Sequence, residues 1–128
     1  MNIISNLQSL KYSMHEFSIV SHLLEAVETQ AHQLEANRVL AINLVVGERS
    51  GLVDESLNFY FDMLAPGTVA EGARLNVRRT SMRFKCQQCG VEYTPPPGDF
   101  HCPTCGEIGQ VVDDASKMLI ESLEINRG

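Results

Sequence analysis

Apolar residues recur at steps of three and four after Ser13, and this spacing places them on one buried face of a helix. Ser13 and Glu16 have the Ser-x-x-Glu spacing of a capping box, which predicts a helix start near Met14. Asn37 is the expected end, and residues 1–13, with their weak periodicity, are expected to form a loose arm. The predicted buried face consists of Phe17, Val20, Leu24, Val27, Ala31 and Leu34.

An alternating pattern follows over residues 39–47 and predicts a strand. Beyond a turn at residues 47–51, Asp54 can act as the N-cap of a second helix, which Pro66 and Gly67 end. The apolar residues are Leu40, Ile42, Leu44 and Val46 on one face of the strand and Leu57, Tyr60, Phe61 and Leu64 on the helix.

Two further strands are predicted, over residues 73–85 and 118–125. In the first of them the inward-facing positions change parity part-way along. A bulge or bend near residues 79–81 would explain that change.

The order of these elements predicts an α+β fold, with two helices, a small three-stranded sheet and a zinc-ribbon-like module inserted before the last strand. The last strand should return to the main sheet, because three strands bury more apolar surface than two. The chain is therefore divided into an N-terminal extension (1–13), an α+β domain (14–85 and 113–128) and a metal module (86–112).

Composition narrows the possible partners. The chain has 128 residues, 44% of them apolar, which is enough for one modest core with an appendage. Its net charge of -6 argues against nucleic acid as the main partner. No segment approaches the roughly 20 apolar residues of a membrane span, and the N-terminal residues lack the pattern of a signal peptide. We expect a cytoplasmic protein with neither nucleic acid nor a membrane as partner.

All four cysteines lie in two Cys-x-x-Cys-Gly steps, at Cys86 and Cys89 and at Cys102 and Cys105. Each step can form a tight turn that aims two thiolates at one point. Two such turns build the tetrahedral all-thiolate site typical of structural Zn²⁺. Iron is the alternative ion. Two disulfides are the alternative without a metal, and the expected compartment disfavours them.

Four thiolates leave no open coordination position, so this site is predicted to be structural rather than hydrolytic. His101 is close enough in sequence to enter the ligand shell, but four thiolates suffice without it. The module is too short for an apolar core of its own. Metal ligation must hold it together, and structural zinc supplies on the order of 10 kcal/mol of folding free energy.

A second candidate metal site lies at the head of the first helix, at Met14, His15 and Glu16. At about 100° per residue, His15 points away from the apolar stripe and Glu16 lies at its edge. Imidazole with a nearby carboxylate and backbone nitrogen suits Ni²⁺, whereas a His–Glu pair at a helix start is commonly a solvated cap. His22 and His32 are expected to be exposed.

No catalytic motif is present in the sequence. A Gly-x-x-x-x-Gly-Lys phosphate loop is absent, so the chain is not expected to hydrolyse nucleotides by itself. All cysteines belong to the metal steps and no Gly-x-Ser-x-Gly elbow occurs, which leaves no candidate nucleophile. We therefore do not expect an enzyme.

Basic residues gather on the strand predicted over residues 73–85. They form either a solvated face and edge, where charge blocks edge pairing, or a docking patch for an acidic partner protein. The five residues are Arg74, Arg78, Arg79, Arg83 and Lys85.

Several short motifs occur in the order found in the hydrogenase nickel-incorporation proteins of the HypA/HybF family, which the chain resembles from about residue 14 to residue 125. Each motif alone is unspecific, but their order is specific. They are Met-His-Glu-Phe-Ser from Met14, Val-Gly-Glu from Val46, Glu-Gly-Ala-Arg-Leu from Glu71, the two cysteine steps, and Ser-Leu-Glu-Ile from Ser122.

The resemblance implies a small metallochaperone that binds Ni²⁺ weakly, works with a GTPase partner and delivers nickel to the large subunit of NiFe hydrogenase. Carried onto this sequence, it makes His15 the principal nickel ligand, Glu16 an auxiliary ligand and the four cysteines the holders of structural zinc. In the family the motif normally begins the chain, so that the α-amine joins the ligands. Here residues 1–13 precede it, and we expect tighter nickel binding by a chain that begins at Met14.

Two other readings fit part of the sequence. A zinc-ribbon adaptor for nucleic acid or protein would explain the cysteines and the basic residues, but it leaves the His–Glu pair unexplained. A rubredoxin-like iron electron carrier would explain the cysteines and the acidity, but it needs none of the preceding residues.

Overall fold

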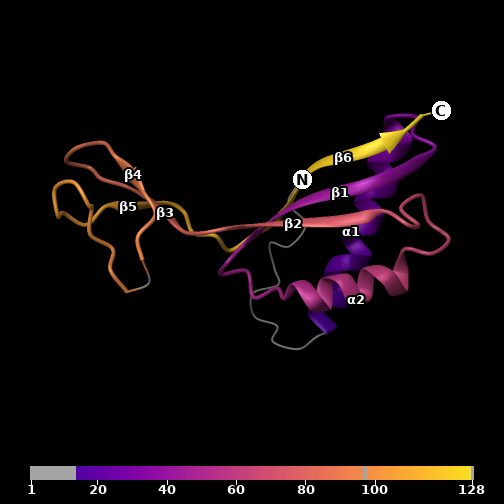
Figure 1. Ribbon diagram of the computed structural model, residues 1–128, viewed down its shortest axis with the longest axis horizontal. Helices are drawn as coiled ribbons and strands as arrows, with labels where there is room; N and C mark the ends of the chain where they lie inside the picture. Colours follow the sequence, from indigo (N-terminus) through magenta and orange to yellow (C-terminus); the bar gives the residue numbers. More distant parts are fainter. Residues whose placement is uncertain (1–13, 97, 128) are drawn as a thin grey trace.

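The structure is a computed structural model that describes residues 14–96 and 98–127. The arm predicted over residues 1–13 lies outside the described residues. The fold has two parts, a sheet covered by two helices and a smaller module joined to it by two extended segments (Figure 1). This arrangement confirms the predicted α+β class with a module inserted before the last strand. None of the described helices is long and apolar enough to cross a lipid bilayer.

Helix α1 (Met14–Gln33) begins at the predicted Met14 and buries one long apolar face. Ser13 of the predicted capping box lies outside the described residues. The middle of the predicted face is buried, but its two ends, Phe17 and Leu34, are exposed. The helix ends before the predicted Asn37, because Glu35 adopts the left-handed region with φ 56°. The buried side chains of this helix include Ile19, Val20, Leu23, Leu24, Val27 and Ala31.

Strand β1 (Arg38–Gly47) is the centre of the main sheet. Its buried positions include Val39, Ile42 and Leu44, whereas Leu40 is 43% exposed. The prediction for Leu40 is wrong because the register shifts between Val39 and Ala41 where β1 pairs with its neighbour. A bulge of this kind turns the following side chains to the opposite face.

Helix α2 (Asp54–Leu64) buries Leu57 and Phe61 and packs against α1. Its N-cap position is Val53 and has no side-chain cap, so the predicted cap at Asp54 is wrong. Asp54 is instead the first helical residue, where a carboxylate interacts favourably with the helix dipole. The helix ends just before the predicted Pro66-Gly67 pair.

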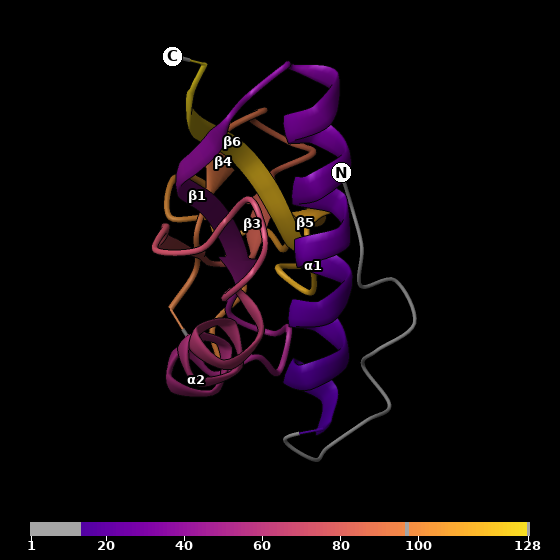
Figure 2. The same ribbon diagram turned by 90° about the vertical axis from the view of Figure 1, so that its right-hand side faces the viewer.

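The main sheet has the order β2-β1-β6, with strand β2 (Arg74–Thr80) parallel to β1 and strand β6 (Met118–Asn126) antiparallel to it. Parallel neighbours need a crossover connection, and α2 supplies the one between β1 and β2. Figures 1 and 2 show the two helices on one side of this sheet. One apolar cluster between the two layers contains side chains from both helices and from the sheet.

The predicted strand 73–85 is divided between two sheets. After β2, the chain bends at Ser81 and Met82 and forms strand β3 (Arg83–Lys85) of a second sheet. The predicted bend is therefore a complete break, and pairing with the small module begins before the boundary expected at Cys86. The second sheet has the order β4-β3-β5, with strands β4 (Glu92–Tyr93) and β5 (Gln110–Asp113).

Most of the basic side chains of residues 74–85 are paired with carboxylates. Exposed ion pairs of this kind contribute about 0–1 kcal/mol each to stability, but they neutralise the local charge. The pairing supports the reading of these residues as a solvated face rather than a patch for an acidic partner. The pairs are Arg74 with Glu124 at 3.3 Å, Arg78 with Glu121 at 2.6 Å, Arg83 with Glu92 at 3.9 Å, and Arg79 with Asp54.

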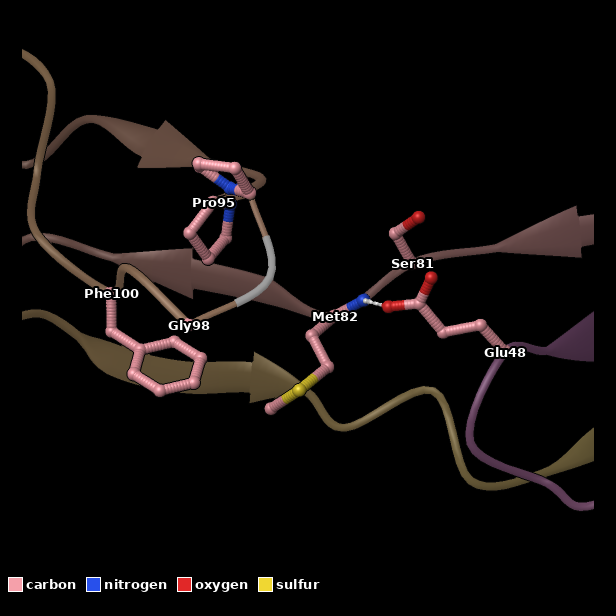
Figure 3. A pocket seen from close by; sticks show the side chains of 7 residues that line it. Glu48, Ser81, Met82, Pro95, Gly98 and Phe100 are labelled. Atoms are coloured by element: carbon pink, nitrogen blue, oxygen red, sulfur yellow. Dashed lines mark hydrogen bonds between the residues drawn. The ribbon is translucent and has the colours of Figure 1, made fainter.

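The two parts of the fold meet at Gly47 and Glu48. A Cβ atom at Gly47 would lie 2.1 Å from the carbonyl oxygen of Ala115, so only glycine permits this close approach. The Glu48 carboxylate accepts a hydrogen bond from the backbone N–H of Met82 at 3.2 Å. Figure 3 shows this contact at the edge of a pocket of about 310 Å³ that Phe100 lines from the module side.

Candidate metal centre

The two cysteine steps form two equivalent turns. In the first, the N–H of Gly90 donates to the carbonyl of Cys86 at 2.9 Å, and in the second the N–H of Gly106 donates to the carbonyl of Cys102 at 2.9 Å. Both glycines have positive φ, 76° and 79°, which explains why each step ends in glycine. The repeated local geometry points two thiols of each turn in the same direction.

The four sulfur atoms converge on one point. All ligand atoms lie within 4.8 Å of one another, with 3.3 Å between the sulfurs of Cys86 and Cys105 and 3.6 Å between those of Cys89 and Cys102. Four sulfurs at about 2.3 Å from a central ion would be about 3.8 Å apart. The cysteines are therefore placed to hold a tetrahedral ion. All four are free, so the structure does not contain the alternative disulfides.

The surroundings of the four thiols give them unequal pKa values. Burial acts to raise the pKa of Cys102, but hydrogen bonds from the backbone N–H groups of Cys105 and Thr104 outweigh it and lower that pKa to about 6. At Cys105 the backbone N–H of Glu107 acts to lower the pKa, but the neighbouring Cys86 sulfur and burial together raise it to about 12. A divalent cation among the sulfurs would favour the thiolate at every position.

Aromatic side chains pack against the two cysteine turns. Tyr93 is 8% exposed, and its hydroxyl donates to the carbonyl of Phe100 at 2.7 Å and accepts from the N–H of Gly109 at 2.9 Å. The rings of Tyr93 and Phe100 both stack on Phe84. Phe84 and Tyr93 form a small buried apolar cluster with Cys86 and Cys102. The expectation that the module has no apolar core of its own is therefore wrong, and no sequence motif pointed to this cluster.

His101 is directed to another partner. Its Nδ1 lies 2.8 Å from Oδ1 of Asp99, and hydrogen bonds from His101 are the main cause of a lowered pKa at Asp99. Within residues 14–96 and 98–127, the group placed to hold a metal consists of the four cysteines alone. His101 is exposed and is not needed as a ligand.

The second candidate site, at the head of α1, contains an unpaired carboxylate. Glu16 is only 6% exposed, and its Oε2 is the one buried side-chain oxygen without a hydrogen-bond partner in the described part of the chain. The side chain of His15 lies outside the described residues. His22 and His32, further along α1, are exposed as predicted.

Glu16 is more deeply buried than its place at the edge of the helical stripe indicated. An unpaired buried carboxylate is costly, and such groups are commonly retained for a functional reason. The sequence offered no signal for this burial, because helical spacing placed Glu16 only at the edge of the apolar stripe.

An α+β domain that carries a four-cysteine module defines a class of small metal-binding proteins. The model of one family, "Hydrogenase/urease nickel incorporation, metallochaperone, hypA", matches residues 14–125. The chain belongs to this family, whose members bind structural zinc and nickel. It is therefore a nickel metallochaperone of hydrogenase maturation, and the early resemblance is confirmed.

Named relatives agree with this assignment. The hydrogenase maturation factor HypA of Caldanaerobacter subterraneus is 38% identical over 113 residues, which cover 88% of this chain and 99% of the relative. The factor of the same name from Geobacter sulfurreducens is 37% identical over 112 residues, with coverage of 88% and 99%.

Solved structures share the fold. The solution structure of the Ni metallochaperone HypA from Helicobacter pylori has a TM-score of 0.63 at 23% identity, and covers 88% of this chain and 98% of its own. Another solution structure of a HypA protein has a TM-score of 0.68 at 24% identity, with coverage of 91% and 100%.

Proposed function

We propose that this protein binds Ni²⁺ at His15 with help from Glu16, holds a structural zinc ion with Cys86, Cys89, Cys102 and Cys105, and delivers the nickel to the large subunit of NiFe hydrogenase. A GTPase of the nickel-insertion pathway acts as its accessory partner. The observation that carries the nickel site is the buried, unpaired carboxylate oxygen of Glu16, next to His15 in the first turn of α1.

The two sites differ in how tightly they can hold an ion, and delivery of nickel requires such a difference. Four converging thiolates bind a borderline-soft ion tightly and leave no open position, so they are suited to structure and not to release. An imidazole with one carboxylate offers few ligands, which suits an ion that must be handed on. Nickel is thus the cargo and zinc the resident ion.

Calorimetric titration with Ni²⁺ tests the nickel site. The His15→Ala variant should lose at least tenfold in nickel affinity, while zinc stays at one ion per chain. His22→Ala is the matched control, because His22 is an exposed histidine on the same helix and should change nothing. Nickel affinity that is the same in His15→Ala as in the unchanged protein would refute the site.

Chain length tests the ligand set. A chain that begins at Met14 carries a free α-amine beside His15, which adds a nitrogen donor of the kind that Ni²⁺ prefers. We expect it to bind nickel more tightly than the chain with residues 1–13. Equal affinities for the two lengths would show that the amine is not a ligand.

A further inference from the structure

Charge is unevenly divided between the two layers of the α+β domain. Helices α1 and α2 contain no lysine or arginine and six acidic residues. The arginines of the domain lie on the sheet and in the connections. Positive groups are thus available to the sheet carboxylates, and the helical layer is left with a net negative charge.

Three of the helical carboxylates are not neutralised. Glu25, Glu55 and Asp62 are exposed, and they form no ion pair within residues 14–96 and 98–127. This contrasts with the arginines of β2, which are paired with acids of β6 and α2. The helical layer therefore carries an acidic face that no basic side chain of the described residues neutralises.

The same face carries large apolar side chains that are wholly or partly exposed, which we call the α2 patch: Phe17, Phe59, Tyr60 and Met63. Phe59 is 61% exposed and Met63 is 51% exposed, and they are neighbours because they are four residues apart on one helix. Tyr60 contacts both Phe17 and Phe59 edge-on, with ring centroids 5.6 Å and 5.1 Å apart. Exposed aromatic and methionine side chains in one cluster are typical of a protein-binding surface.

A shallow groove between the two helices continues the patch, because Ser21 and Leu64 in its lining lie one helical turn beyond Phe17 and Tyr60. Leu24 and Leu64 line it together with Glu25 and Glu28, and its volume is about 200 Å³. The groove combines apolar side chains with carboxylates at its edge. Its partner must therefore provide apolar side chains flanked by positive charge.

We propose that the α2 patch and this groove form the docking surface for a partner protein that presents apolar side chains among lysines and arginines. Phe17 directly follows Glu16, so a protein docked here lies beside the proposed nickel site and can receive or supply the ion. The inference rests on the proposed function for the identity of that partner. A second copy of this chain is the poorer occupant, because two acidic faces repel each other.

Calorimetric titration tests the surface with two purified probes, the GTPase of the nickel-insertion pathway and the nickel-free hydrogenase large subunit. The first variant combines Phe59→Ser with Met63→Ser, and the second combines Glu55→Lys with Asp62→Lys. All four side chains are exposed, so neither variant should unfold the protein. We expect each to weaken binding of at least one probe tenfold or more. The first variant removes apolar anchors, and the second places positive charge opposite the positive charge of the partner.

Ile108→Ser is the control, because Ile108 is 64% exposed but lies on the small module. It should bind both probes like the unchanged chain, and that binding should weaken as salt is added. Binding that both variants leave intact would overturn the surface but not the proposed function. Failure of both probes to bind the unchanged chain would instead overturn the proposed partners, and this inference with them.

Two other occupants would also overturn the proposal. If a second copy covers the patch, sedimentation would show that the unchanged chain is a dimer and that the variant with Phe59→Ser and Met63→Ser is a monomer. Amide chemical shifts along α2 that differ between the full chain and a chain that begins at Met14 would identify residues 1–13 as the occupant.

Discussion

Replacing Glu16 by methionine should make the protein more stable and impair its binding of nickel. The carboxylate is 6% exposed and its Oε2 has no hydrogen-bond partner in the described residues. Leaving a buried polar group unsatisfied costs about 1–3 kcal/mol. A negative charge in the first turn of a helix contributes about 0.3–1 kcal/mol of stability. The desolvation cost is the larger, and the substitution should stabilise the fold by about 1–2 kcal/mol.

Thermal unfolding of the zinc-loaded, nickel-free protein measures this effect, and we expect the midpoint to rise by about 3–8 °C. Methionine suits the site because it is a good helix former that adapts to irregular apolar surroundings. Glu25→Met is the matched control, since it removes an exposed charge from the same helix and should change stability by less than about 0.5 kcal/mol. A Glu16→Met variant that is less stable than the parent would mean that the carboxylate is satisfied, and the reasoning would fail.

Two further predictions concern the cysteine module. Tyr93→Phe removes a hydroxyl that joins two loops and should destabilise the module by about 1–3 kcal/mol. Faster hydrogen exchange at the amide of Gly109 would reveal this loss. Unchanged exchange would show that water replaces the hydroxyl. Zinc binding should release fewer than four protons at pH 7.5. The pKa of Cys102 is lowered to about 6, so this thiol has already lost its proton, whereas the pKa of Cys105 is raised to about 12, so that thiol still has a proton to release. Zinc affinity should therefore fall with decreasing pH, most steeply below about pH 6. Calorimetry in buffers of different ionisation enthalpy measures both the proton release and the affinity. Release of four or more protons would contradict the unequal pKa values of the thiols.

Patterns within a few residues predicted the elements well. The spacing of apolar residues located α1, and the two Cys-x-x-Cys-Gly steps located the thiols that the structure brings within 4.8 Å of one another. These signals are reliable because the interactions they describe are local. A turn or a helical face depends mainly on its own residues, wherever the element is placed in the fold.

Predictions that depended on neighbouring elements were less successful. Leu40 is exposed because of a register shift against β6, and Asp54 pairs with Arg79 where a cap was expected. The strand predicted over residues 73–85 is divided because its two halves find partners in different sheets. In each case the outcome is decided by residues distant in the sequence, which no periodicity records.

The sequence by itself determined the α+β class, the cysteine cage and the family, since all three depend on local spacing and on the order of motifs. Only the tertiary structure decided that Glu16 is buried without a partner and that the arginines of β2 are neutralised. Arg78 and Glu121 meet across the sheet although they are 43 residues apart. The same packing uses the positive charges on the sheet and leaves Phe59 and Met63 exposed on an acidic helical face, because burial and pairing are properties of the assembled layers.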